Sequence, residues 1–343
     1  MKRMDVLLAV FLPVVVTAAL VLWRYKKALA RARDAAKSGG LIASTSCGPI
    51  EYAATGTGIP VLSIHGAGGG YDQGLANATD LVGDGFRVIA PSRFGYLRTP
   101  IPPDASPAAQ ADAHAALLSK LDIPKAIVVG VSAGARSAVE FAIRHRDRVI
   151  GLILIVPGTY SPTSPVSVEA SRGSKLVFWL VNAGADFCWW ALEKVAPSLL
   201  IRFIGVRPEL VAASPKADRD RVTSIVRGIQ PLSLRFPGIN LDSTADLRPL
   251  PLEKISAPTL LLSARDDLFN TLPAAEFAAS RIRDARLIVF ETGGHLLVGH
   301  DEEVRAAIRT FLTRAGVMSP PVVATAGPKN RGEHSPPRQQ LTG

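Results

Sequence analysis

A serine between glycines stands where an apolar run gives way to a helical pattern. Residues 130–134 read Gly-Val-Ser-Ala-Gly, which places Ser132 in a G-x-S-x-G pattern. The run Ala126–Val131 predicts a buried strand, and 133–145 predicts a helix. A sharp turn between them would expose the serine hydroxyl at the carboxyl end of the strand, above a helix N-terminus that favours developing negative charge. The pattern is weak alone, but its position predicts a nucleophile.

A serine hydroxyl needs a base within hydrogen-bond reach, and the base needs a carboxylate that orients it. His295 follows the predicted strand Arg286–Phe290 and is the candidate base. Asp266 and Asp267 follow the predicted strand Thr259–Ser263, and on the residues alone either can be the orienting acid. We expect His65 to brace a turn, and His114 and His145 to lie on exposed helix faces.

Backbone amides that could stabilise an oxyanion are predicted in two places. The segment HGAGGG, residues 65–70, follows the predicted strand Val61–Ile64 directly, so the amides of Gly66 and Ala67 can point toward a substrate oxygen. The amide of Ala133, the residue after the serine, is the second donor. Losing one such donor costs on the order of 10²–10³ in rate.

The elements that must position these residues alternate between short β-branched runs and Ala-rich helical segments. This alternation predicts an α/β fold with a mostly parallel sheet flanked by helices. Further strands are predicted at Arg87–Ala90 and Ile150–Val156, and further helices at 107–121, 272–282 and 302–315. Two cysteines in 343 residues are too few for a disulfide framework or a Cys-based zinc site.

This alternation of strands and helices is interrupted once, and the interruption indicates the domain organisation. We expect an N-terminal segment (1–40), a first core part (41–157), a helical lid (158–250), a second core part (251–316) and a disordered tail (317–343). The lid contains three of the four tryptophans, Trp179, Trp189 and Trp190. A lid of this apolarity motivates the hypothesis of a lipophilic acyl substrate.

The N-terminal segment predicts a membrane anchor. Val6–Trp23 is an eighteen-residue run without a charge, which spans about 27 Å as a helix, against about 30 Å of hydrocarbon. Basic residues are more frequent after the run than before it, which favours a single-pass helix with the catalytic domain in the cytoplasm. A cleaved signal peptide is the alternative, although the run is longer than a usual signal and RYKKALARAR would resist translocation.

The net charge of +10 is concentrated at the ends of the chain. Up to Lys37 there are eight basic and two acidic residues, and after Ala315 three basic and one acidic, so the central domain is close to neutral. A nucleic-acid-binding fold would place its basic patch on the folded domain. We therefore expect no nucleic-acid partner.

Five segments together carry a family resemblance between about Gly48 and Ala315, the insertion excepted. The chain resembles lidded serine esterases and C–C hydrolases of the α/β-hydrolase-fold superfamily. The segments are SIHGAGGG, APSRFGYLRT, VVGVSAGA, LLSARDDLF and ETGGHLLVGH. The resemblance implies a triad of Ser132, His295 and an aspartate. The family pattern G-x-x-D-x-Φ, where Φ is apolar, favours Asp267, with Ala264 in place of glycine, whereas counting from Ser263 favours Asp266.

The implied activity is hydrolysis of a carboxylic ester or related acyl substrate through an acyl-enzyme, without a metal or organic cofactor. A serine at position 132 speaks against epoxide opening and halide displacement, which relatives perform with an aspartate. Acyl transfer, C–C hydrolysis and haloperoxidase-like perhydrolysis on the same triad are alternatives. A ligand-binding receptor that uses the hydrolase fold without catalysis is the alternative from another class.

Overall fold

The computed structural model describes residues 2–163 and 186–318, the side chains of residues 2–10 excepted. An eight-stranded sheet forms the centre, in the order β1-β2-β4-β3-β5-β6-β7-β8. The strands are β1 (Leu41–Thr45), β2 (Gly48–Gly56), β3 (Ile59–Ile64), β4 (Phe86–Pro91), β5 (Ala126–Val131), β6 (Val149–Ile155), β7 (Thr259–Ala264) and β8 (Ala285–Phe290). β2 is antiparallel to both neighbours, and β4, β3, β5, β6, β7 and β8 run parallel.

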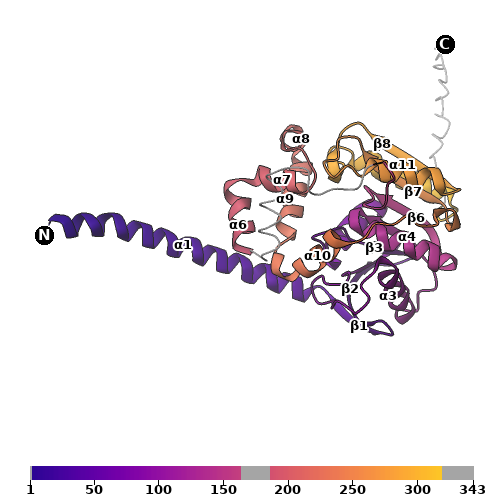
Figure 1. Ribbon diagram of the computed structural model, residues 1–343, viewed down its shortest axis with the longest axis horizontal. Coiled ribbons are helices and arrows are strands. Elements are labelled where there is room, and N and C mark those ends of the chain that lie inside the picture. Colours follow the sequence, from indigo (N-terminus) through magenta and orange to yellow (C-terminus); the bar gives the residue numbers. More distant parts are fainter. Residues whose placement is uncertain (1, 164–185, 319–343) are drawn as a thin grey trace, which may run out of the picture.

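Helices cover both faces of the sheet (Figure 1). On one face α3 (Pro107–Lys120), α4 (Ala135–Arg144) and α11 (Leu272–Arg281) pack on one set of alternating strand residues. On the other face α2 (Tyr71–Val82) and α12 (Asp301–Arg314) pack on the second set. The central parallel strands are buried on both faces, which explains their nearly continuous apolar sequence.

All six predicted strands are present, but two strands and a helix were not predicted. β1 and β2 form the antiparallel edge of the sheet, and they mix buried and exposed residues without a regular alternation. α2 follows the HGAGGG segment directly. One expectation for a side chain is wrong: His114 is fully buried, because α3 packs closely against α4 and the imidazole Nε2 lies 3.3 Å from Ser137 Oγ.

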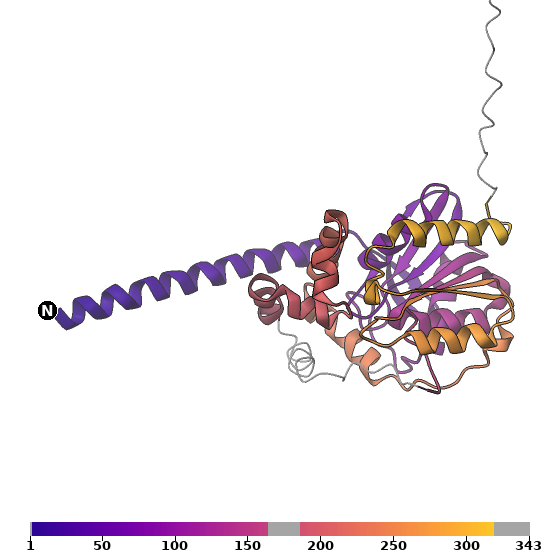
Figure 2. The same cartoon turned by 90° about the horizontal axis from the view of Figure 1, so that it is seen from above.

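Between β6 and β7, the structure describes a group of helices with its own apolar core. These insertion helices are α6 (Asp186–Val195), α7 (Pro197–Phe203), α8 (Pro208–Ala213), α9 (Lys216–Gly228) and α10 (Phe236–Thr244), with the short turn η3 (Leu232–Leu234) before α10. They lie over the carboxyl ends of the strands (Figures 1 and 2). Trp179 and most of the predicted tail, 319–343, lie outside the described residues.

A single long helix, α1 (Lys2–Ser38), projects from the rest of the molecule (Figure 2). Among the residues that the structure describes, no helix is long and apolar enough to cross a membrane. The predicted segment Val6–Trp23 falls within α1, and the side chains of its residues 6–10 are outside the described set. The single-pass anchor therefore stays a prediction.

The C-terminal end of α1 is fixed to the core by Tyr71, the first residue of α2. The Tyr71 hydroxyl accepts a hydrogen bond from Gly39 N–H at 3.2 Å and lies 3.2 Å from the carbonyl oxygens of Ala35 and Ala36. A β-carbon on Gly39 would lie 2.7 Å from this hydroxyl. The glycine that ends α1 is therefore required for the close contact with Tyr71.

Candidate active site

Ser132 occupies a strained turn between β5 and α4. Its φ is +51°, in the left-handed region that residues with a side chain rarely adopt, and it begins a short turn of 3₁₀ helix, Ser132–Gly134. The flanking glycines permit the turn. A β-carbon on Gly134 would lie 2.5 Å from the carbonyl oxygens of Ile64 and His65, and one on Gly130 would lie 2.6 Å from Ala138 Cβ. The predicted strand-turn-helix context is present.

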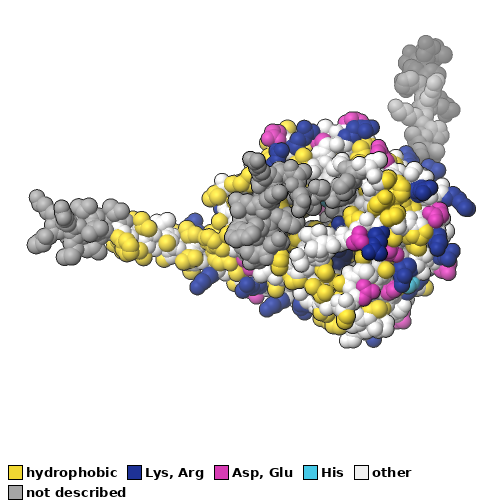
Figure 3. Space-filling view, in the orientation of Figure 1, with side chains coloured by type: hydrophobic (Ala, Val, Ile, Leu, Met, Phe, Trp, Pro, Cys, Tyr) yellow, Lys and Arg dark blue, Asp and Glu magenta, His cyan; other side chains and the backbone are white. Residues whose placement is uncertain are grey.

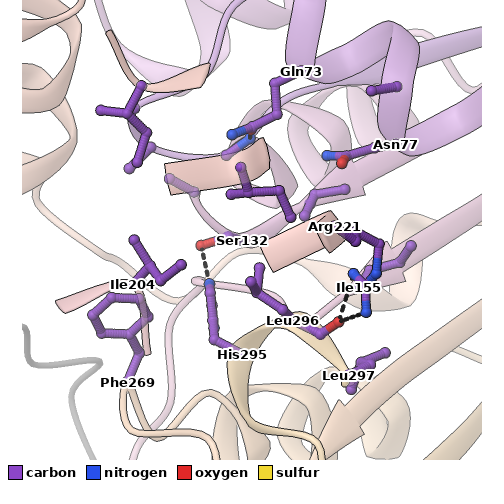
Figure 4. Close-up of a pocket in the computed structure, with 18 of the residues that line it drawn as sticks. Gln73, Asn77, Ser132, Ile155, Ile204, Arg221, Phe269, His295, Leu296 and Leu297 are labelled. Atoms are coloured by element: carbon purple, nitrogen blue, oxygen red, sulfur yellow. Dashed lines mark hydrogen bonds between the residues drawn. The ribbon is translucent and has the colours of Figure 1, made fainter. Parts of the chain in front are cut away.

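Ser132, His295 and Asp267 are connected by two hydrogen bonds. His295 Nε2 lies 2.8 Å from Ser132 Oγ, drawn as a dashed line in Figure 4, and His295 Nδ1 lies 2.8 Å from Asp267 Oδ2. Because a carboxylate only accepts, the Nδ1 proton is donated to Asp267 and Nε2 is left to accept from the serine hydroxyl. The imidazole has the tautomer that a general base requires.

The environment of Asp267 favours its ionised form. Burial raises the pKa of this carboxyl, but attraction to His295, together with hydrogen bonds from His295, the Thr271 hydroxyl and Phe269 N–H, outweighs burial and holds the pKa below its usual value. An ionised Asp267 can orient the imidazole and stabilise an imidazolium.

Asp266, the alternative acid, has a different position. Its Oδ1 accepts a hydrogen bond from Gly294 N–H at 2.7 Å, and its Oδ2 accepts one from Arg207 at 3.0 Å. Asp266 therefore braces the loop that carries His295, while Asp267 contacts the imidazole itself.

Gly205, which follows α7, supports the triad in a way that sequence reasoning missed. Its carbonyl oxygen accepts hydrogen bonds from His295 N–H at 3.1 Å and from Leu268 N–H at 3.2 Å. Its φ is +85°, and a β-carbon would lie 2.5 Å from His295 Cβ and 2.9 Å from the Phe269 ring. The insertion thus brackets the histidine loop and the acid turn through one backbone group. No local sequence signal marks this glycine.

The predicted oxyanion amides lie beside Ser132, but one of them is engaged. Gly66, Ala67 and Ala133 all line the cavity described below. Gly66 N–H donates to Gln73 Oε1 at 3.1 Å. Ala67 is therefore the better placed donor on the HGAGGG segment, with Ala133 as the second donor.

His65 holds this oxyanion loop in place and stays neutral. Its Nε2 accepts from Arg93 N–H at 3.0 Å, so its Nδ1 carries the proton and donates to Gly66 O at 2.7 Å. Complete burial, together with the nearby Arg93 guanidinium, lowers the pKa of His65 well below its usual value. The expected bracing role fits these contacts.

A buried ion pair connects α10 to the oxyanion loop. Arg93 forms a bidentate pair with Asp242 at 2.7 and 2.6 Å and donates from Nε to His65 O at 2.9 Å. The Tyr96 hydroxyl donates to Asp242 at 2.5 Å and accepts from Gly68 N–H at 3.3 Å. Burial raises the pKa of Asp242, but attraction to and hydrogen bonds from Arg93, with smaller contributions from Arg136 and Tyr96, hold it below its usual value.

A second buried arginine makes a similar connection. Arg235, at the start of α10, donates to Gly69 O at 2.6 Å and pairs with Asp72 at 2.6 Å. Two residues of the HGAGGG segment are thus connected to the insertion. Gly68 bonds Tyr96, which bonds Asp242 of α10, and Gly69 bonds Arg235 directly.

A cavity of about 700 Å³ lies between the core and the insertion helices, with Ser132 and His295 in its wall. The wall is mostly apolar near Ser132 and His295. Figure 4 shows Ile204 and Phe269 on one side of Ser132, and Asn77 and Arg221 on the other. Around the latter side the lining also includes Asp80, Asp220, Asp301 and Arg305. The cavity therefore suits a substrate with an apolar part and a polar part.

Within the described ranges 2–163 and 186–318, no group of three His, Cys, Asp or Glu side chains is placed to hold a metal ion.

Comparison with known proteins identifies the family of the chain. A family model described as alpha/beta hydrolase fold matches residues 59–300, so the chain belongs to this family and is a hydrolase. Hydrolase YcgS of Bacillus subtilis is 28% identical over 73% of this chain and 89% of its own length. The 2-hydroxymuconate semialdehyde hydrolase of Pseudomonas putida is 28% identical over 77% of this chain and 90% of its own length.

Among solved structures, a thermophilic esterase from Thermogutta terrifontis superposes with a TM-score of 0.58 at 25% identity, over 81% of this chain and 99% of the esterase. An alpha/beta hydrolase fold protein from Nakamurella multipartita superposes with a TM-score of 0.61 at 28% identity, over 81% of this chain and all of that protein. The predicted α/β-hydrolase fold, with a mostly parallel sheet flanked by helices, is confirmed.

Proposed function

We propose that the chain is a membrane-anchored serine hydrolase that cleaves a carboxylic ester with a lipophilic acyl group. The observation that carries the proposal is the pair of hydrogen bonds from Ser132 to His295 and from His295 to Asp267, in the wall of a largely apolar cavity. A strained serine with a correctly oriented base is the arrangement that acyl transfer to serine requires.

The first half of the reaction forms an acyl-enzyme. Ser132 Oγ attacks the carbonyl carbon while His295 Nε2 takes the hydroxyl proton, and the carbonyl π pair moves to the oxygen. The amides of Ala67 and Ala133 stabilise this oxyanion. When the carbonyl re-forms, the carbon–oxygen bond to the leaving alcohol breaks, and His295 returns its proton to that alcohol.

The second half regenerates the enzyme. His295 takes a proton from a water molecule as its oxygen attacks the acyl carbon, and the resulting oxyanion occupies the same amide site. Its collapse breaks the bond to Ser132 Oγ, which recovers the proton from His295, and the carboxylic acid leaves. Asp267 stays ionised throughout and stabilises the imidazolium.

The exposed apolar surface of α1 supports the anchor. Phe11, whose side chain is 69% exposed, and Trp23 are among nine large hydrophobic residues that α1 exposes between positions 11 and 23. Figure 3 shows hydrophobic side chains along this part of the helix. An apolar helix projecting into water is unfavourable, whereas a bilayer would bury it. The basic residues after Trp23 then favour a catalytic domain on the cytoplasmic side.

An activity-based probe tests the catalytic proposal directly. We expect a fluorophosphonate to label the wild type, and Ser132→Ala to abolish labelling and to lower ester turnover by roughly 10³-fold or more. Ser137→Ala is the matched control, because this buried serine contacts His114 rather than the triad. A wild-type protein that neither reacts with the probe nor cleaves esters would contradict the proposal.

C–C bond hydrolysis on the same triad is the second candidate. It is favoured by the similarity to 2-hydroxymuconate semialdehyde hydrolase over most of both chains. Turnover of 2-hydroxymuconate semialdehyde and of nitrophenyl esters, compared on one enzyme preparation, separates the two candidates. Faster cleavage of the semialdehyde than of any ester would favour the second one.

A further inference from the structure

Helix α6 separates the cavity from α1 and contacts both. Trp189 is 2% exposed, lines the cavity and donates from its indole nitrogen to Val226 O at 3.0 Å. Phe187 and Trp190 lie one helical turn apart and pack on Tyr25 of α1, with ring centroids 5.1 and 5.8 Å from the Tyr25 ring. One short helix therefore presents one side to the substrate cavity and another to α1.

An ion pair adds to this contact. Arg33 of α1 lies 3.6 Å from Asp186, the first residue of α6. The same carboxylate accepts hydrogen bonds from Ser233 N–H at 3.0 Å and from the Ser233 hydroxyl at 2.7 Å. Asp186 thus joins α1, α6 and η3, so the position of α6 is defined relative to α1.

The contact lies close to the end of the uncharged part of α1. Tyr25 comes two residues after Trp23, which is about 3 Å along a helix axis. In a spanning helix, this level is the membrane interface, where Trp and Tyr are enriched and basic residues meet anionic headgroups. Arg24, Lys26 and Lys27 are found at this level.

The outer surface of α6 and α7 continues the apolar surface of α1. Phe187, Val195 and Leu199 are exposed by 40%, 79% and 49%, and outside α1 they make up half of the large exposed hydrophobic residues in the described part of the chain. Two basic residues, Lys194 and Arg202, belong to the same two helices. Both ribbon views show α6 as the part of the insertion beside α1, on the side from which α1 projects (Figures 1 and 2).

We propose that α6 and the start of α7 rest on the bilayer surface beside α1, and that the cavity receives its substrate from the bilayer. The substrate class is an amphiphilic ester with a long acyl chain that resides in the membrane. Its chain enters beside Trp189, and its polar part lies toward Asn77 and Arg221. Such a route avoids exposing the acyl chain to water. This inference rests on the proposed membrane-anchored hydrolase and names its substrate class.

The test uses the full chain reconstituted in vesicles of phosphatidylcholine and phosphatidylglycerol. Nitrophenyl palmitate in the bilayer is compared with nitrophenyl acetate in the aqueous phase. The variant Val195→Asp/Leu199→Asp places charges on the α6–α7 surface without touching the cavity lining. Because interfacial binding scales with buried apolar area, we expect palmitate turnover to fall about tenfold, while acetate turnover is unchanged.

Leu41→Asp is the matched control, since Leu41 is an exposed residue on β1, outside the α6–α7 surface. We expect it to leave both rates unchanged. Unaltered palmitate turnover in the double variant, or an equal fall on both substrates, would overturn the inference. The proposed function is tested separately, by Ser132-dependent acetate hydrolysis and by flotation of the wild type with the vesicles. If the wild type is active and floats with the vesicles, and the double variant keeps its palmitate turnover, the membrane route is refuted while the proposed function stands.

Discussion

The insertion is attached to the rest of the molecule at two places that differ in chemistry. The inner attachment consists of a buried ion pair, Arg93 with Asp242, and of the buried Arg235, whose partner Asp72 is 37% exposed. The outer attachment consists of aromatic contacts with Tyr25 and an ion pair whose arginine, Arg33, is 48% exposed. Removal of one partner from a buried pair strongly lowers the free energy of unfolding, whereas an exposed pair contributes little to it.

The difference indicates separate roles for the two attachments. The inner one reaches the oxyanion loop, through Tyr96 to Gly68 and through Arg235 to Gly69. The outer one reaches α1, the cavity wall at Trp189 and, through Asp186, Ser233 of η3. Changes at the inner attachment should affect stability and turnover on every substrate, and changes at the outer attachment should affect neither strongly.

The largest effect is expected at Asp242. Replacement by Asn leaves Arg93 buried without its counter-charge, which should lower the free energy of unfolding by about 3–5 kcal/mol. Urea denaturation measures this loss. Asp246→Asn is the control, because Asp246 pairs with Arg248 on an exposed surface just after α10 and should change little. Equal stability of the two variants would contradict a difference between buried and exposed pairs.

Gly205→Ala should have the next largest effect, because the insertion touches the triad there. The new β-carbon has no space beside His295 and Phe269, and the positive φ adds strain of about 1–3 kcal/mol. A displaced imidazole should lower kcat on a soluble ester by about a hundredfold. Gly228→Ala, at a glycine with nothing within 4 Å of the added carbon, is the control and should retain activity. A fully active Gly205→Ala enzyme would refute the bracketing role.

Two buried carboxylates, Asp242 of the inner attachment and Asp267 beside His295, should make the stability sensitive to acid. The pKa values of Asp242 and Asp267 are both held below their usual value in the folded state. The stabilisation they give is therefore present above the unfolded-state pKa of about 3.9 and is lost as the pH falls through the folded-state values. Urea midpoints measured from neutral pH downward should fall steeply below about pH 4 in the wild type. The fall should be shallower in Asp242→Asn, and identical slopes would contradict the assignment.

The smallest effect is expected at the outer attachment. Arg33→Ala should lower the free energy of unfolding by less than about 1 kcal/mol, because the arginine is half exposed. Turnover of nitrophenyl acetate should stay at the wild-type rate. A loss comparable to that of Asp242→Asn, measured under the same conditions, would show that the two attachments do not differ as proposed.

The elements that could be predicted from the sequence are those whose own residues carry a recognisable pattern. The buried parallel strands are apolar throughout, and the order of the five motifs specified the fold family. Ser132, His295 and the aspartate pair follow strands, so the topology brings them to one edge of the sheet. The hydrogen bond from His295 to Asp267 identifies which aspartate contacts the base.

The missed features depend on tertiary contacts. β1 and β2 are half exposed at the sheet edge, and their strand pattern is weak. His114 stands between Ala113 and Ala115 in the sequence, and its burial comes from the packing of α3 against α4. Gly205 and Asp242 acquire their roles from residues far away in sequence, and no local pattern identifies them.

The contact between Tyr71 and the end of α1 has a consequence for diffusion. The Tyr71 hydroxyl lies 3.2 Å from three backbone atoms of residues 35–39, so the C-terminal end of α1 is held against the start of α2. In the proposed membrane-bound enzyme, this attachment would restrict the domain to lateral diffusion in the bilayer plane and rotation about the membrane normal. The α6–α7 surface would stay turned toward the lipid, so each lateral encounter with a substrate would occur in nearly the same orientation.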